Sequence, residues 1–103
     1  MRRRSAKRNP KRCPTHPGEM LREDILPALK MTKIEVADAL GISRQHLYDL
    51  LNEKKPVSPE IAARLGKAFG NGPGIWLRMQ ATYDAWQAAR NVDVSRVRSL
   101  HAA

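Results

Sequence analysis

Apolar positions recur at helical spacing along most of the chain and predict a series of short amphipathic helices. The clearest pair runs from Thr32 to Asn52, with Gly41 between the two. Thr32 is followed three residues later by Glu35, the spacing of a capping box that marks a helix start. Gly41 can adopt the positive φ that ends a helix, and Ser43 can cap the next one. The segment therefore predicts two helices joined by a tight turn.

The second helix of this pair has one polar face and one apolar face. At 100° per residue, Tyr48 and Asn52 fall within about 60° of Gln45, and three leucines lie on the opposite side. Ala37, four residues before Gly41, leaves room for the second helix to cross closely over the first. This arrangement is typical of a helix-turn-helix, whose packed side anchors the second helix while its polar side reads a groove of DNA.

Three further helices complete a predicted all-α domain. The segment 17–25 begins with a proline and an acidic first turn, and Pro27 is expected to end or kink that helix. Ser58 is followed by a proline and opens another helix, which Gly70 stops. A loop rich in glycine precedes a fifth helix that starts near Ile75.

The fifth helix carries an apolar stripe of four large side chains spaced by three, four and three residues: Trp76, Met79, Tyr83 and Trp86. We expect this stripe to be largely buried, in the domain core or in a dimer interface, rather than to line a cofactor pocket. Past Arg90 the valines mix period two with helical spacing, so the last residues extend the helix, pair as a strand or fray.

The charge is strongly positive and unevenly distributed. Nineteen Lys and Arg stand against ten Asp and Glu, giving a net charge of +9 and a pI near 10.5. Seven of the basic residues precede Glu19, the first acid, so the remainder carries only +2. We predict a basic flexible arm over 1–15, a helix-turn-helix domain over 16–90, and a tail or helix extension over 91–103. Such a charge is typical of a protein that binds a polyanion.

Several function classes are disfavoured by what the sequence contains. Apolar runs are only a few residues long, and the Arg-rich start lacks the apolar stretch of a secretion signal, so we expect a cytoplasmic protein without a membrane contact. Cys13 is the single cysteine, which excludes an internal disulfide. Cys13 and His16 have the spacing of half a metal site, but no second pair follows. With no phosphate loop and no nucleophile beside a base, we expect neither a cofactor nor an enzyme.

An ordered series of short motifs resembles the HigA-type antitoxins of the Xre/Cro/C1 helix-turn-helix family. The motifs are His16 to Glu19, Ala39 to Arg44, Asn52 to Lys55, and Trp76-Leu77 with Gln80, Tyr83-Asp84 and Trp86-Gln87. The resemblance spans roughly residues 16–90. It implies a lambda-repressor-like fold and a homodimer that represses its own operon by binding operator DNA. It also implies a partner, a small RelE-like toxin that cleaves mRNA on ribosomes.

Three positions depart from the pattern of that family. Glu53 stands where glycine is frequent, so we expect Asn52 or another residue to cap the turn. Lys33 replaces a frequent glutamine, which keeps a phosphate contact possible with changed geometry. The arm before His16 is more basic than the family suggests.

We assign the candidate DNA-binding residues by their position around the second helix and its flanks: Lys33, Ser43, Arg44, Gln45, His46, Tyr48, Asn52, Lys54 and Lys55. Residues in the first turn of a recognition helix enter the major groove. There Gln45 can pair with adenine, and Arg44 with guanine or with a phosphate. Tyr48 suits a phosphate or a thymine methyl group.

The loop after the helix and one acid within it have less defined roles. Lys54 and Lys55 either bind phosphates or are simply solvated. Asp49 would repel phosphates, so it accepts a hydrogen bond from cytosine or orients a neighbouring side chain.

Two other functions remain open from the sequence. The first is a stand-alone Xre-family transcriptional regulator with no toxin partner, which only gene context separates from an antitoxin. The second is an RNA-binding protein, suggested by size and charge, in which a basic disordered segment recognises RNA without a groove-reading helix.

Overall fold

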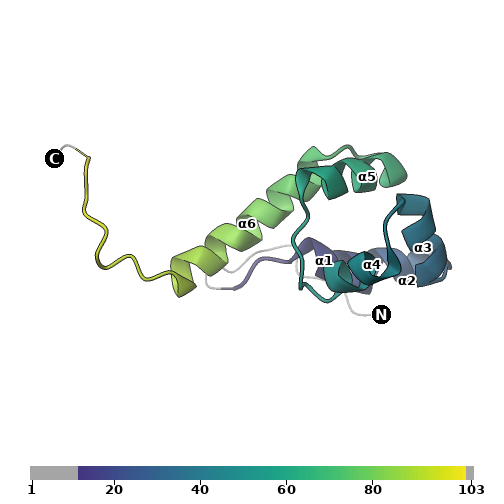
Figure 1. Ribbon diagram of the computed structural model, residues 1–103, viewed down its shortest axis with the longest axis horizontal. Helices are drawn as coiled ribbons and strands as arrows, with labels where there is room; N and C mark the ends of the chain where they lie inside the picture. Colours follow the sequence, from purple (N-terminus) through teal and green to yellow (C-terminus); the bar gives the residue numbers. More distant parts are fainter. Residues whose placement is uncertain (1–11, 102–103) are drawn as a thin grey trace.

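The computed structural model describes residues 12–101 (Figure 1), so residues 1–11 of the predicted arm lie outside it. Its elements are α1 Pro17–Met20, a π-helical turn Leu21–Ile25, α2 Leu26–Leu29, α3 Lys33–Leu40, α4 Arg44–Leu51, α5 Pro59–Phe69 and α6 Gly74–Asn91. The first three run on as one helix, and residues 12–101 contain no strand. The prediction of an all-α domain of five helices is confirmed. No helix among these residues is long and apolar enough to cross a membrane.

The first helix continues past the proline that was expected to end or kink it. Pro27 has no N–H to bond the carbonyl four residues back, and the turn before it is widened. In this π-helical turn the Leu26 N–H donates to the Leu21 carbonyl, five residues back. The helix therefore ends only at Lys30, whose backbone is left-handed with φ 56°.

The predicted caps of the next helices are confirmed. The Thr32 hydroxyl accepts from the Glu35 N–H at 3.1 Å, and the Thr32 N–H donates to the Glu35 carboxylate at 2.8 Å. This backbone hydrogen bond lowers the pKa of Glu35. The Ser58 hydroxyl accepts from the Ile61 N–H at 3.2 Å, with a proline at the first helical position. Gly41 and Gly70 end their helices at φ 72° and 75°.

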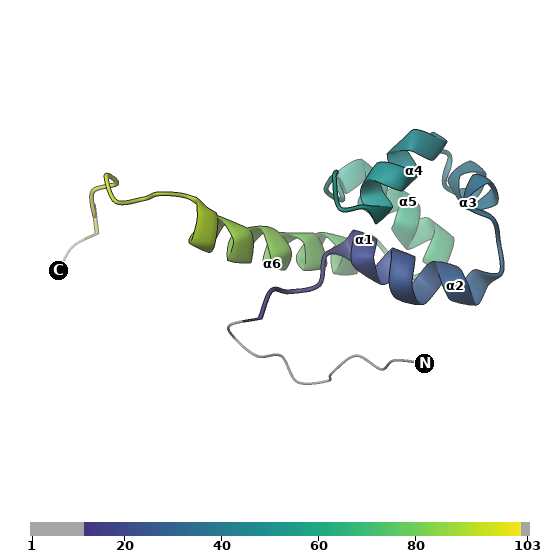
Figure 2. The same ribbon diagram turned by 90° about the horizontal axis from the view of Figure 1, so that it is seen from below.

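One apolar core joins all five helices. Its members are Leu21, Leu26, Val36, Ala37, Leu40, Leu47, Leu50, Leu51, Val57, Ile61, Ala62, Leu65 and Trp76. Gly18 allows α1 to approach α4 closely, because a Cβ at that position would collide with the Leu50 carbonyl. Figure 2 shows α2 running on from α1, with α1 at the end of the domain nearer to α6.

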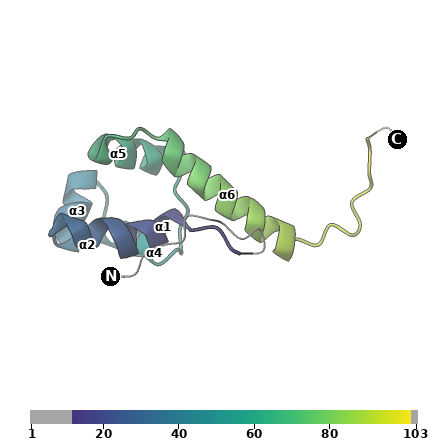
Figure 3. The ribbon, with the colours of Figure 1, turned by 180° about the vertical axis from the view of Figure 1, so that it is seen from behind.

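Helix α6 leaves this core and extends well beyond it, as Figure 3 shows from behind. Trp76, near its start, is fully buried, and its indole N–H donates to the Asn71 side chain at 3.0 Å. Met79, Tyr83 and Trp86 are only half-buried within one chain. Of the two places expected for the stripe, the domain core therefore holds Trp76, because the other helices cover mainly the first part of α6. Burial of the other three side chains in a dimer interface stays a prediction.

The tail after α6 is not helical. The helix ends at Asn91, and residues 92–101 form turns and extended chain. An extension of the helix is thereby excluded. The valines and the leucine of this segment are between 57% and 94% exposed. Figure 1 shows the tail directed away from the domain, so these apolar side chains do not contribute to the core.

His16 fixes the start of the first helix and links it to α6. The imidazole is buried, and its Nδ1 accepts from the Gly18 N–H at 2.9 Å. The ring stands nearly perpendicular to the Tyr83 ring, with 4.8 Å between centroids. Burial lowers the pKa of His16, although the carboxylates of Glu53, Asp84 and Glu19 act in the opposite direction and Arg22 acts with burial. The neutral imidazole is the form that can accept the Gly18 hydrogen bond.

We expect the free energy of unfolding to decrease as the pH falls from about 6.5. Below that pH the unfolded chain binds a proton at His16 more readily than the folded protein, whose pKa is lowered. One such group contributes a slope of at most about 1.4 kcal/mol per pH unit. Urea unfolding between pH 7 and pH 5 measures it.

The control is His16→Asn, because an asparagine side chain also caps a helix but does not titrate. In this variant the free energy of unfolding should depend less on pH between pH 7 and pH 5. An unchanged slope in the variant would show that another group titrates.

Candidate nucleic-acid interface

The turn between α3 and α4 is built from local hydrogen bonds that the sequence dictates. The Gly41 N–H donates to the Asp38 carbonyl at 3.1 Å, and the Ile42 N–H donates to the Ala37 carbonyl at the same distance. The Ser43 hydroxyl then accepts from the His46 N–H at 3.0 Å and caps α4. Ser43 therefore has a structural role in positioning α4, whatever else its hydroxyl contacts.

The two faces of α4 separate as the pattern predicts. Leu47, Leu50 and Leu51 are at most 2% exposed and anchor the helix in the core. The opposite face carries four of the candidate residues in exposed positions: Arg44, Gln45, Tyr48 and Asn52. The helix is thus held by its leucines and presents a polar surface along its whole length.

An acid in the middle of this surface brings two candidate residues together. The Gln45 amide nitrogen donates to the Asp49 carboxylate at 2.9 Å. The ammonium of Lys55, from the following turn, lies 4.0 Å from the other Asp49 oxygen. The Asp49 side chain is only 18% exposed, whereas Lys55 is 53% exposed. Gln45, Asp49 and Lys55 therefore form one polar cluster at the surface of α4.

A second contact joins the two helices of the motif at the surface. The ammonium of Lys33, the first residue of α3, lies 5.6 Å from the centroid of the Tyr48 ring. At that distance a cation is attracted to the face of the ring. The contact places the positive charge of Lys33 beside the exposed face of α4. His46, in contrast, is half-buried and lies beside this face rather than on it.

Of the alternatives left open for the turn after α4, the structure uses a residue other than Asn52. Asn52 has φ −90°, and the left-handed conformation falls on Glu53, with φ 62°. A non-glycine residue in this region is strained, and long-range contacts hold it in place. The Arg22 guanidinium lies 3.4 Å from the Glu53 carboxylate and donates to the Leu51 carbonyl at 2.6 Å. This turn presents Lys54 and Lys55 to solvent next to α4.

Three polar residues outside the motif support it through contacts that the sequence did not predict, although Gln80 is one of the residues that resemble the HigA-type antitoxins. Arg22 holds the turn after α4, and Arg64 of α5 donates to the carbonyls of Leu40 and Gly41 at 3.0 and 3.2 Å. The buried Gln80 of α6 accepts from the Val57 N–H at 2.7 Å. Each joins segments more than 20 residues apart, so no local pattern could have indicated these contacts.

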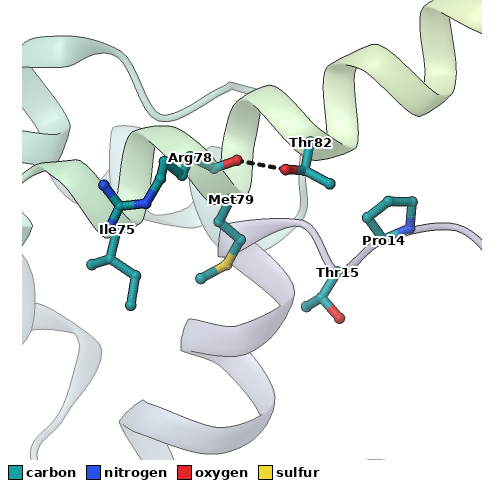
Figure 4. Close-up of a pocket in the computed structure, with 6 residues that line it drawn as sticks. All are labelled: Pro14, Thr15, Ile75, Arg78, Met79 and Thr82. Carbon is teal, nitrogen blue, oxygen red and sulfur yellow. Dashed lines mark hydrogen bonds between the residues drawn. The ribbon is translucent and has the colours of Figure 1, made fainter. Parts of the chain in front are cut away.

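A separate groove lies along α6, at the end of the predicted arm. Pro14 and Thr15 face Ile75, Met79 and Arg78 across it, and the Thr82 hydroxyl donates to the Arg78 carbonyl at 2.9 Å (Figure 4). It encloses about 440 Å³ and is open to solvent. No candidate DNA-binding residue lines it. Residues 12–101 therefore offer one candidate surface on α4 and a separate one on α6.

Comparison with known proteins gives consistent matches. The helix-turn-helix family model (HTH_3) matches residues 21–77. The antitoxin HigA-1 of Vibrio cholerae is 35% identical over 79 residues, which cover 77% of this chain and 74% of that protein. The Pseudomonas aeruginosa antitoxin HigA, solved with the higBA promoter, is 28% identical with a TM-score of 0.72, covering 84% of this chain and 96% of that one. The antitoxin GraA in complex with its operator is 30% identical with a TM-score of 0.77, covering 86% and 93%.

Proposed function

The chain belongs to the helix-turn-helix family that includes the HigA-type antitoxins, and we propose that it is a DNA-binding antitoxin that represses its own operon. The observation that carries this proposal is the exposed polar face of α4, held in place by three buried leucines. Two similar proteins were solved with promoter or operator DNA, which supports the same use of this fold here.

The proposed roles of the surface residues follow from their positions. Arg44 and Gln45 read bases in the major groove, because they lie exposed in the first turn of α4. Tyr48 and Lys33 contact the DNA backbone as a pair. Lys54 and Lys55, in the turn after α4, bind DNA phosphates. Two further candidates, Ser43 and His46, flank this face at the start of α4, and Asn52 lies on it at the end of the helix.

We expect the protein to bind DNA as a symmetric homodimer. One helix of eight residues covers only a few base pairs, and a two-fold axis doubles the site. Half-sites should then lie about 34 Å apart on a palindromic operator. Light scattering at micromolar concentration, with and without the duplex upstream of its own gene, measures the mass. A monomer under both conditions would contradict this prediction.

The proposed protein partner is a small RelE-like toxin, as the resemblance to HigA-type antitoxins implies. The half-buried side chains of α6 and the groove beside them offer a surface separate from the DNA-binding face. Co-purification with the product of the neighbouring gene tests this pairing. If the neighbouring frames encode no small protein that binds the chain, the stand-alone regulator is the correct function.

The experiment that tests the DNA-binding function compares the upstream duplex with a scrambled one. Gln45→Ala should weaken binding to the upstream duplex by about 1–3 kcal/mol, because a bidentate base contact is lost, and leave the scrambled duplex almost unaffected. Fluorescence anisotropy titrations at fixed salt measure both affinities. Gln87→Ala, on α6, is the matched control and should change neither.

A clear negative result is defined by three variants together. If Gln45→Ala, Arg44→Ala and Tyr48→Ala all preserve the ratio of the two affinities, then α4 does not read the sequence. If removing the basic arm alone abolishes binding to every nucleic acid, an RNA-binding function through the arm is favoured instead.

A further inference from the structure

The side-chain amide of Gln45 is held by a hydrogen bond within its own helix. Its nitrogen donates to an Asp49 oxygen at 2.9 Å, one helical turn away. Residues four apart lie on the same face of a helix, so this bond forms without distortion of the backbone. An exposed glutamine otherwise samples many rotamers, and this contact restricts it before DNA is bound.

Asp49 is itself fixed by the turn that follows α4. The backbone carbonyl of Asp49 accepts from the backbone N–H groups of Lys54 and Lys55 at 2.8 and 3.3 Å. The Lys55 ammonium lies 4.0 Å from the second carboxylate oxygen of Asp49, and the Asp49 side chain is 18% exposed. The acid therefore faces Gln45 with one oxygen and Lys55 with the other.

We propose that Asp49 is a positioning residue that sets the Gln45 amide to select adenine, an inference that rests on the proposed DNA-binding function. An ionised carboxylate only accepts hydrogen bonds, so the NH2 group of Gln45 turns toward it. The amide oxygen and the second N–H of that group then remain available. They form an acceptor and a donor side by side.

This pair of groups matches one base in the major groove. Adenine presents its N6 amino group as a donor and N7 as an acceptor, which complement the amide oxygen and the second N–H. Guanine presents two acceptors, O6 and N7, so the amide oxygen would face O6 without a hydrogen between them. If the Gln45 amide rotated by 180°, its donor and acceptor would exchange places and could pair with other bases. Asp49 disfavours that orientation, because the amide oxygen would then face the carboxylate.

The same geometry argues against direct cytosine recognition by Asp49. Both carboxylate oxygens already face cationic or N–H groups, and most of the side chain is shielded from solvent. Of the two roles that the sequence left open for this acid, the structure supports the orientation of a neighbour.

Removing the acid should affect affinity and discrimination in opposite directions. Asp49→Ala deletes a negative charge near the phosphates, so binding to random duplex should strengthen or stay the same. It also frees the Gln45 amide, so the preference for adenine over guanine should fall by a factor of about 5 to 20. A variant that merely folded poorly would lose affinity for both duplexes.

The experiment selects duplexes from a random-sequence pool with the full-length wild-type protein and with three variants. Gln45→Ala identifies the base position that Gln45 reads, as the position whose adenine preference disappears. At that position Asp49→Ala should show the reduced preference, and so should Asp49→Asn, because an amide can present its NH2 group to Gln45 and its oxygen to Lys55. Replacing that adenine by 7-deazaadenine, which lacks the N7 acceptor, should weaken wild-type binding about 5-fold or more and affect Asp49→Ala much less.

The possible outcomes distinguish a failure of the positioning role of Asp49 from a failure of the proposed DNA-binding function. If Gln45→Ala removes an adenine preference that Asp49→Ala preserves in full, Asp49 does not position the glutamine, and DNA reading by α4 stands. If the wild-type protein enriches a sequence whose preferences no Gln45 variant changes, the inference is also overturned. If the wild-type protein enriches no duplex, the proposed function fails and the inference falls with it.

Discussion

Replacing Trp76 by alanine is expected to lower the free energy of unfolding by about 3–5 kcal/mol. The side chain is fully buried at the junction of α6 with the rest of the core, and its ring packs against Phe69 at 6.0 Å between centroids. The substitution leaves a cavity and also removes the hydrogen bond to Asn71. Urea unfolding followed by circular dichroism measures the loss, which is a large part of the stability of a domain of this size.

The matched control is Trp86→Ala, on the same helix and with the same change in side-chain volume. Trp86 is half-buried, with the Arg90 guanidinium 4.0 Å above its ring. Within a single chain its removal should cost about 1–2 kcal/mol, because less apolar surface is re-exposed. If Trp86→Ala costs as much as Trp76→Ala, and the cost grows with protein concentration, the outer part of α6 is buried between two copies.

Deleting residues 1–12 is expected to have the largest effect on DNA binding, and equally on operator and random duplexes. The segment carries seven positive charges and no acid. Each phosphate neutralised contributes about 0.9 to the slope of log affinity against log salt. The deletion should therefore flatten this slope by up to about 6 and weaken binding by several orders of magnitude at low salt. Titrations at four or more salt concentrations measure the slope.

A full-length variant with these seven residues changed to glutamine is the control for chain length. It should behave like the deletion if charge alone matters. An unchanged salt slope would show that the arm does not contact phosphates. If the arm enters the minor groove, both variants should also lose preference for A·T-rich flanks.

Local signals predicted much of the helix-turn-helix. The capping box at Thr32, the glycine at the turn and the serine cap of α4 each depend on residues within four positions of one another. The leucine pattern of α4 likewise predicts which face is buried, because a regular helix fixes the angular position of every residue. For this reason the exposed candidates on α4 could be chosen without coordinates.

The supporting contacts could not be predicted in the same way. Arg22 reaches the Leu51 carbonyl across 29 residues, and Gln80 reaches the Val57 N–H across 23. In sequence each looks like an ordinary polar residue on a helix. The left-handed conformation of Glu53 also depends on a distant contact. That conformation favours glycine or asparagine, and here the Arg22 guanidinium lies against the Glu53 carboxylate.

The sequence by itself determined the helices, their caps, the polar face of α4 and the concentration of positive charge in the arm. These features follow from propensities and periodicity over a few residues, which act in any context. The tertiary structure decided that only Trp76 of the α6 stripe is buried in the core and that the tail leaves the helix after Asn91. It also brought the Arg22 guanidinium against the left-handed turn at Glu53 and the Gln80 side chain against the Val57 N–H. The physical reason is that burial, and the orientation of a polar side chain, depend on which distant segments pack nearby.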